Sequence, residues 1–481
     1  MKKIYTALAL VLTLMGATSC NDFLDVRPKG EKVEGDLFSS AKGFEEAIYG
    51  VYGSMAAESL YGRDLVWGIP DVLSQDLKCT STTMSALAKY DFDSDDNLRS
   101  RFSAIWTNAY KTIGYANNVL QNLDKTELDL PLHDSYRGEM LAVRAMLHFD
   151  LLRLFAPTAE GKRGIPYVET YNFSVKPFLT VGECYGKIIN DLTEAERLLA
   201  ADEHIMTWPR DNARYLKFEN WRETHLNIHA VRALLARVYW YRGDMPNAAH
   251  YATMVADEVC FPLVDVTEVQ SHVAGVLCPK ETIFGLSSTK YLDTSISLLY
   301  NFTSFKSYDP YTSDANESML SWEKLFQLDI PATSQDFRRT HFYVANSVAR
   351  CLKMVDYQAM ENGGNNSRPD LIAGVSLIGV SEMYIIAADA LLDTDPDRAL
   401  LYYNRETSSR GLTSVGADEG LTHERISNEF HKELYCQGQQ WFNMKRSYAD
   451  IMSNFEGRTI PGSETIYVIP VPAEEFEYRP E

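Results

Sequence analysis

The feature that most constrains the fold is a helical periodicity between residues 226 and 256. Its apolar side chains recur at the spacing i, i+3, i+4, i+7 and i+8, so they share one face of a helix. Gly243 and Asp244 end this helix, and Pro246 suits the first turn of a second helix. The segment therefore predicts two helices that pack closely across a short turn. The apolar positions are Val231, Leu234, Leu235, Val238 and Tyr239 in the first helix and Ala248, Ala252, Val255 and Ala256 in the second.

This helix-turn-helix has the residue pattern of a tetratricopeptide repeat, with Gly243 at the turn and Ala248 in the second helix. A similar unit contains Ala387 and Ala390, followed by a turn through residues 393–396. Further amphipathic segments supply two more helix pairs by the same logic, so we expect a mainly α fold of about four stacked pairs. These segments are 41–57, 100–123, 134–155 and 180–200.

Two stretches, roughly 60–98 and 260–375, lack long periodicity and are rich in small polar and aromatic residues. They predict loops with short strands or short helices. No low-complexity linker interrupts the chain, so we expect one compact body over residues 36–481. Within it, 36–260 is mainly helix-pair scaffold, and 260–481 is a loop-rich ligand region plus the final helix pair.

The N-terminus has the pattern of a lipoprotein signal peptide over residues 1–19. Lys2 and Lys3 precede an apolar run that is too short to span a bilayer, and small residues lead up to Cys20. Cys20 is therefore the predicted lipidation site, where acyl chains such as palmitate would be attached, and residues 20–35 form a polar tether. No later stretch has membrane-spanning length, so we expect the lipid alone to hold the body at the membrane.

Charge and cysteine spacing exclude several classes of protein. The formal net charge of −20 becomes −22 when the two signal-peptide lysines are removed, which argues against nucleic acid or anionic lipid as a partner. The six later cysteines are scattered, with no CxxC pair and no histidine at zinc-site spacing. Cys260 and Cys278 are the nearest pair, and a disulfide between them stays open.

Catalytic motifs are absent. The chain has no HExxH, no GxSxG, no phosphate-binding glycine loop and no dinucleotide fingerprint. Arg144, Glu139, Arg232 and Arg237 lie on apolar helices and are assigned to structural roles, by ion pairing or by hydrogen bonding to a helix end. His148 and His229 are interpreted as interior or interface groups. We expect no enzyme activity, no catalytic or metal-binding residue and no cofactor beyond the lipid; a structural calcium ion is compatible with the sequence but not indicated.

A series of short motifs runs in order along nearly the whole mature chain. It includes Cys20-Asn21-Asp22-Phe23-Leu24-Asp25, Ala116-Asn117, Arg144-Ala145, Gly164-Ile165-Pro166, Glu382-Met383-Tyr384, Arg410-Gly411 and Lys445-Arg446. Each motif is weak alone, but the set is specific, and it resembles the SusD/RagB family of nutrient-binding outer-membrane lipoproteins.

The chain departs from the family pattern near its end. Where the family usually has a Glu-Arg pair, then Glu-Gly, Arg and Asp, this sequence has Glu429-Phe430, Gln437-Gly438, Gln440 and Asn443. These residues predict that several buried ion pairs are replaced by amide and aromatic contacts. The departure marks a divergent branch and weakens the transfer of ligand identity.

The resemblance implies a SusD-like fold and a function in nutrient uptake. It implies a lipid-anchored outer-membrane protein, facing the cell exterior, that binds an oligosaccharide or polysaccharide and delivers it to a SusC-like TonB-dependent transporter. A branch of the same family binds peptides instead, which leaves a peptide as the alternative ligand. An all-α surface glycoside hydrolase is a third hypothesis, and it requires two carboxylates that face each other across a cleft. A structural surface protein without a ligand is a fourth, and exposed aromatic residues that line no pocket would support it.

Aromatic and polar side chains in the two irregular stretches are the ligand-binding candidates, because aromatic faces stack on the C–H face of a sugar ring. The family's glycan-binding members use loop aromatics from these regions. For any single residue the alternative is a ring that pins its loop to the scaffold. The candidates are Tyr61, Trp67, Asp76, Tyr90, Tyr300, Tyr308, Tyr311 and Trp322.

Overall fold

The computed structural model describes most of the chain from Glu34 onward. The predicted signal peptide, Cys20 and nearly all of the tether lie outside the described residues, as do Tyr308, Tyr311, Trp322 and the side chain of Tyr300. The described ranges are 34–79, 81–210, 218–270, 280–288, 290–300, 305–307, 325–326, 335–345, 348–351, 353, 374–453 and 458–477.

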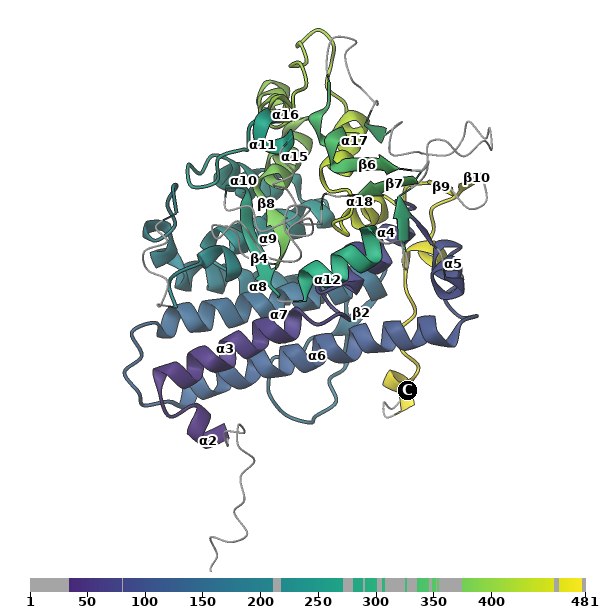
Figure 1. Cartoon of the computed structure of the whole chain (residues 1–481). Helices are drawn as coiled ribbons and strands as arrows, with labels where there is room; N and C mark the ends of the chain where they lie inside the picture. The colour runs from purple at the N-terminus through teal and green to yellow at the C-terminus, as the bar shows by residue number, and fades with distance from the viewer. Residues whose placement is uncertain are drawn as a thin grey trace, which may run out of the picture.

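Eight of the described helices stack in chain order, each against the next (Figure 1). They form the four predicted pairs, and the mainly α architecture is confirmed. None of the described helices is both long and apolar enough to cross a lipid bilayer. The stacked helices are α3 (Ala41–Met55), α6 (Asp96–Lys125), α7 (His133–Phe155), α8 (Val181–Leu198), α9 (Ile228–Arg242), α10 (Met245–Ala256), α15 (Val380–Leu391) and α16 (Pro396–Ser409).

The turn between α9 and α10 follows from local chemistry. The side chain of Asn227 accepts a hydrogen bond of 3.0 Å from the backbone of Ala230 and caps the start of α9. Gly243 ends α9 with φ +89°, a left-handed conformation that glycine adopts without strain. Asp244 then caps α10, with Pro246 in its first turn. The predicted helix boundaries are confirmed here.

Small residues allow the helices to approach closely. Ala236, Ala248 and Ala387 are fully buried on the facing sides of their helices. Gly138 of α7 lies against the end of α8, where an added Cβ atom would come within 2.7 Å of Cγ of Leu199. The sequence signature of small residues therefore corresponds to tight helix packing.

The described parts of the two irregular stretches contain short elements, as predicted. The strands pair antiparallel: β1 (Leu77–Cys79) with β5 (Phe305–Ser307), β2 (Arg163–Pro166) with β3 (Phe178–Thr180), β4 (Thr282–Ser287) with β8 (Gly374–Gly379), β6 (Phe342–Ala345) with β7 (Val348–Cys351), and β9 (Ile451–Ser453) with β10 (Arg458–Ile460). The other helices are α2 (Glu34–Leu37), η2 (Asp64–Gly68), α4 (Ile69–Leu73), α5 (Thr82–Ala88), η3 (Ala200–His204), η5 (Arg222–Thr224), α11 (Val266–Gln270), α12 (Tyr291–Ser295), η6 (Ile296–Tyr300), η7 (Phe337–His341), α17 (His423–Glu433), α18 (Gln440–Arg446), α19 (Glu464–Tyr467) and α20 (Glu474–Glu477).

Buried charges pair with one another, which confirms their structural assignment. Arg237 contacts Glu382 at 2.5 Å, and Glu139 contacts Arg222 at 2.5 Å. The predicted replacement of ion pairs near the C-terminus is wrong at Glu429, which pairs with Arg338 at 2.5 Å. The missing partner is supplied by a distant segment of the chain. Gln440 and Asn443 do share an amide hydrogen bond of 3.1 Å, as expected.

Candidate ligand-binding cleft

The four predicted candidates whose side chains are described lie in the core. Trp67 is fully buried and packs edge-on against Tyr291, with ring centroids 5.5 Å apart. Tyr90 is nearly buried and stacks on Trp441 at 6.1 Å. Rings covered in this way offer no open face to a sugar, so they hold their loops on the scaffold in this structure.

Tyr61 and Asp76 are buried, and each side chain is hydrogen-bonded to another buried residue. The Tyr61 hydroxyl donates to the Asp150 carboxylate at 2.5 Å, and the Asp76 carboxylate contacts Nε2 of His431 at 2.6 Å. The expectation of an exposed ligand surface is not met at these two residues either. Packing against the scaffold, the alternative that the sequence left open, describes all four.

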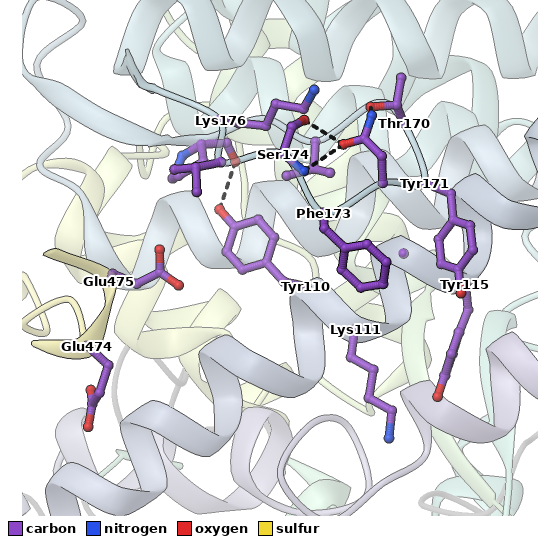
Figure 2. Close-up of a pocket in the computed structure, with 15 residues that line it drawn as sticks. Tyr110, Lys111, Tyr115, Thr170, Tyr171, Phe173, Ser174, Lys176, Glu474 and Glu475 are labelled. Atoms are coloured by element: carbon purple, nitrogen blue, oxygen red, sulfur yellow. Dashed lines mark hydrogen bonds between the residues drawn. The ribbon is translucent and has the colours of Figure 1, made fainter. Parts of the chain in front are cut away.

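An open cleft of about 500 Å³ lies between α6 and residues 167–177, the loop that joins β2 to β3 (Figure 2). Its volume is within the usual range for small-molecule sites. Figure 2 shows Phe173 and Tyr171 extending from the loop toward α6, while Tyr110, Lys111 and Tyr115 project from that helix. Glu474 and Glu475 of α20 complete the wall.

Three of the cleft's aromatic rings are open to solvent. Phe173 is fully exposed, Tyr171 is 44% exposed and Tyr115 is 40% exposed. Single exposed apolar side chains are ordinary, but three around one cleft form the kind of apolar surface that marks a binding site. The cleft can therefore offer flat apolar faces to a ligand.

Polar groups stand beside these rings. The Asn172 side-chain oxygen accepts hydrogen bonds from the backbone N–H and the hydroxyl of Ser174, at 3.0 and 2.5 Å, and this turn fixes the loop between Tyr171 and Phe173. The Lys111 ammonium lies 5.7 Å from the ring centroid of Tyr115. Such groups supply hydrogen bonds that orient a ligand stacked on the rings.

The base of the loop is fixed by buried polar side chains on the scaffold. The Asn117 amide donates to the carbonyl of Val168 at 2.8 Å, and Nε2 of His148 accepts from the N–H of Val168 at 3.0 Å. Burial lowers the pKa of His148 to about 3, so the ring is neutral and able to accept that bond. The Arg144 guanidinium adds a hydrogen bond of 3.3 Å to the carbonyl of Glu169. The cleft wall is thus anchored before any ligand arrives.

Sequence reasoning missed this cleft because it searched only the two irregular stretches. The available signal was Tyr171 and Phe173 in a short polar run without helical periodicity, directly after the motif Gly164-Ile165-Pro166. The helix residues Tyr110 and Tyr115 gave no such signal, because aromatic residues on an amphipathic helix usually belong to the core.

The stacked helix pairs define a helical-repeat protein, and comparison with known proteins shows what the chain is similar to. The family described as "Starch-binding associating with outer membrane" matches residues 22–240. SusD-like protein P2 of Formosa agariphila is 26% identical over 92% of this chain and 90% of its own. The match to the family includes α6 and the loop at 167–177, which form most of the cleft.

Solved structures agree with the sequence matches. A SusD superfamily protein of Bacteroides thetaiotaomicron has a TM-score of 0.72 at 21% identity, covering 91% of this chain and 98% of its own. A structure described as a laminarin-binding SusD-like protein has a TM-score of 0.65 at 17% identity, covering 91% of this chain and 97% of its own. Over residues 22–240 the chain is similar to this family, and the predicted SusD-like fold is confirmed.

Proposed function

We propose that this chain is a non-catalytic lipoprotein of the outer membrane that binds glycans and delivers them to a SusC-like TonB-dependent transporter. The observation that carries the proposal is the open cleft with three exposed rings, Tyr115, Tyr171 and Phe173. The family's description as starch-binding and a related structure's description as laminarin-binding support a glycan as the ligand.

The chemistry of the cleft suits an uncharged oligosaccharide. The exposed rings would take the C–H faces of successive sugars, while Lys111 and Glu474 would hydrogen bond to hydroxyl groups. Two lysines, Lys111 and Lys176, balance Glu474 and Glu475 on the wall. A neutral ligand therefore meets no net formal charge from these four groups.

Binding without cleavage fits the positions of the carboxylates in the cleft. Hydrolysis of a glycosidic bond usually needs two carboxyl groups that face each other across the sugar, at about 5–9.5 Å. The carboxylates among the described lining residues, Glu474 and Glu475, are neighbours on the short helix α20. Neighbouring residues on a helix point in different directions, which does not suit them as an acid and a nucleophile on opposite sides of a substrate.

The membrane anchor and the partner belong to the same proposal. A signal peptide over residues 1–19 would be removed, and the lipid on Cys20 would hold the body at the outer membrane, facing the cell exterior. The family's description as associating with the outer membrane supports that location. The stacked repeat helices would supply an extended surface for the transporter.

Calorimetry tests the proposal. The full chain, purified in detergent, is titrated with α-glucans, β-glucans, mannans and a panel of peptides. We expect one glycan class to bind, and Phe173→Ala and Tyr171→Ala to weaken that binding at least about tenfold, since each removes a stacking face worth about 1.4 kcal/mol or more. Tyr49→Ala is the matched control, because Tyr49 is 50% exposed on α3 and is not part of the cleft.

The other outcomes separate the parts of the proposal. Binding of peptides without any glycan would overturn the ligand class and favour the peptide-binding alternative. Glycan binding that survives both cleft substitutions would retain the function and reject the cleft as its site. Release of reducing sugars during the titration would overturn the absence of catalysis.

A further inference from the structure

A second group of side chains, remote from the cleft in sequence, gathers where the repeat pair α9–α10 begins and ends. His229 lies in the first turn of α9, and Glu258 and Cys260 follow the end of α10. One potential metal-ligand atom from each residue lies within 4.8 Å of the other two. Nε2 of His229 is 3.9 Å from Sγ of Cys260, and Nδ1 is 4.0 Å from a carboxylate oxygen of Glu258.

The buried imidazole of His229 has one ring nitrogen without a hydrogen-bond partner among the described residues. Its side chain is 2% exposed, it packs edge-on against Phe261 at 5.3 Å, and Nδ1 has no hydrogen-bond partner in the described part of the chain. A buried polar atom without a partner costs about 1–3 kcal/mol. An unpartnered nitrogen beside a carboxylate, on a ring whose other nitrogen faces a thiol, indicates a ligand that would use one of the two nitrogens.

We propose that His229, Glu258 and Cys260 form a binding site for a divalent transition metal ion of the zinc type. An imidazole nitrogen, a thiolate and a carboxylate are ligands that zinc accepts, whereas calcium and magnesium prefer oxygen ligands alone. Ligand atoms of a tetrahedral zinc ion, with bonds of about 2.0–2.3 Å, lie roughly 3.3–3.7 Å apart. The three ligand atoms lie within 4.8 Å of one another, so they would have to close by up to about 1 Å. Three protein ligands leave a fourth position for water or another donor.

Burial favours the neutral form of His229, which can bind a metal ion, but it disfavours the thiolate form of Cys260. Burial lowers the pKa of His229 to about 4, so its ring is neutral, as a ligand must be. Burial raises the pKa of the Cys260 thiol to about 11, with Arg210 acting in the opposite direction. The metal must therefore displace the thiol proton, and its affinity should rise with pH.

The charges around the site admit a cation. Arg232 is engaged by Glu196 at 2.8 Å and by Glu203 at 2.5 Å, and it lies 3.9 Å from Glu258. The Arg210 guanidinium lies over the ring of Phe261 at 5.0 Å. Three carboxylates thus oppose two guanidinium groups before the thiol ionises, so the surroundings are net negative.

A metal ion bound at this site would link the start of α9 to the segment that follows α10. These two segments also meet through the contact of Arg232 with Glu258. A ligand that binds the folded chain and not the unfolded chain raises the stability of the fold. The expected role is therefore structural, and it is independent of glycan binding in the cleft.

Cobalt substitution tests the site directly. The full chain, purified without a histidine tag and stripped with a chelator, is titrated with Co²⁺ and separately with Zn²⁺. We expect one equivalent of Co²⁺ to give a thiolate-to-cobalt charge-transfer band and tetrahedral d–d bands, and Zn²⁺ to abolish both and to raise the melting temperature. Cys260→Ser should remove the charge-transfer band, whereas Cys184→Ser, at another buried thiol, should retain it.

Two further variants keep the test decisive. His229→Gln and Glu258→Gln should each weaken Zn²⁺ binding at least about tenfold, and Glu258, which is partly exposed, is the safer change for folding. A cobalt complex without a thiolate band would overturn the proposal. So would a band that persists in Cys260→Ser, or a Zn²⁺-induced rise in melting temperature that is equal in the wild type and Glu258→Gln.

Discussion

Arg144 of α7 donates two hydrogen bonds of 2.7 Å, one to each carboxylate oxygen of Asp191 on α8. This bidentate contact has the strongest geometry available to an arginine and a carboxylate. The same guanidinium reaches the carbonyl of Glu169, and the Asp191 carboxylate also accepts the hydroxyl of Tyr167 at 2.6 Å. One buried pair thus joins two scaffold helices to the start of the loop that carries Phe173.

Loss of Arg144 should therefore damage both stability and the cleft. We expect Arg144→Leu to lower the free energy of unfolding by about 3–5 kcal/mol, because it leaves Asp191 buried without its charged partner. Chemical denaturation measures the loss. Arg197→Leu is the control: its partner Glu194 is exposed on α8, and such surface pairs contribute less than about 1 kcal/mol. Equal losses in the two variants would contradict the structural role of the buried pair.

Two helical glycines should respond in opposite directions to alanine. An added Cβ at Gly50, on the exposed side of α3, meets nothing within 4 Å, so Gly50→Ala should stabilise the protein by about 0.5–1 kcal/mol through lower chain entropy in the unfolded state. At Gly138 the same atom would lie 2.7 Å from the buried side chain of Leu199, so Gly138→Ala should destabilise. Thermal unfolding distinguishes the signs, and two shifts of the same sign would contradict the packing described.

The parts of the fold that were predictable from sequence are those that local chemistry determines. Gly243, Asp244 and Pro246 specify a helix end, a cap and a first turn within four residues, so their meaning does not depend on the rest of the chain. The burial of Trp67 and Tyr90 depends on Tyr291 and Trp441, which are distant in sequence. Periodicity carries no information about such partners, and an aromatic residue in a polar loop looks the same whether it is covered or open.

The sequence did not predict the cleft, for a related reason. It forms where the exposed face of α6, at Tyr115, meets the loop at Phe173, and the position of that loop is set by Asn117, Arg144 and His148 inside the scaffold. These three residues were recognised as family motifs or interior groups, but their function in holding a loop is a property of the tertiary structure. The metal-ligand group has the same origin, because His229 and Cys260 come together only when α9 and α10 pack.

Substitution of Trp67 and Phe173 should separate the two roles of aromatic residues. Trp67 is fully buried, so Trp67→Ala should cost about 3–5 kcal/mol of unfolding free energy. Phe173 is fully exposed, so Phe173→Ala should change stability by less than about 0.5 kcal/mol while it weakens ligand binding. Chemical denaturation of the free protein measures both. A Trp67→Ala variant that keeps full stability but loses ligand binding would restore Trp67 as a contact residue.

The last prediction concerns a buried cluster that joins η7 to α16 and α17. Glu433 accepts hydrogen bonds from Arg410 at 2.8 and 3.0 Å and from Arg338 at 2.9 Å. The Glu406 carboxylate lies 3.3 Å from Nε of Arg410 and 3.7 Å from the guanidinium of Arg338, yet neither of its oxygens accepts a hydrogen bond from the described residues. Burial, together with the charges of Glu429 and Glu433, raises the pKa of Glu406 well above its usual value of 4.5. Burial and the neighbouring carboxylates therefore favour the protonated form of Glu406.

Glu433 behaves in the opposite way. Burial opposes its ionisation, but Arg410, Lys353 and Arg338 together hold its pKa below the usual value. The stability that Glu433 contributes is present above the pKa of the unfolded chain, 4.5, and is lost as the pH falls. At neutral pH, Glu433→Gln should destabilise by about 3–5 kcal/mol, because two buried guanidinium groups lose the charge that they bind.

Glu406→Gln should behave differently from Glu433→Gln and depend on pH with a defined sign. The folded wild type retains a proton on Glu406 that the unfolded chain releases above pH 4.5, so this residue costs stability as the pH rises. Glutamine is nearly isosteric with the protonated acid and does not titrate. The stability of Glu406→Gln relative to the wild type should therefore increase as the pH rises above 4.5, whereas that of Glu433→Gln should not. Urea denaturation at several pH values measures both trends. A loss in Glu406→Gln as large as that in Glu433→Gln, constant with pH, would show that Glu406 is ionised in the folded protein and that the cluster holds one more negative charge.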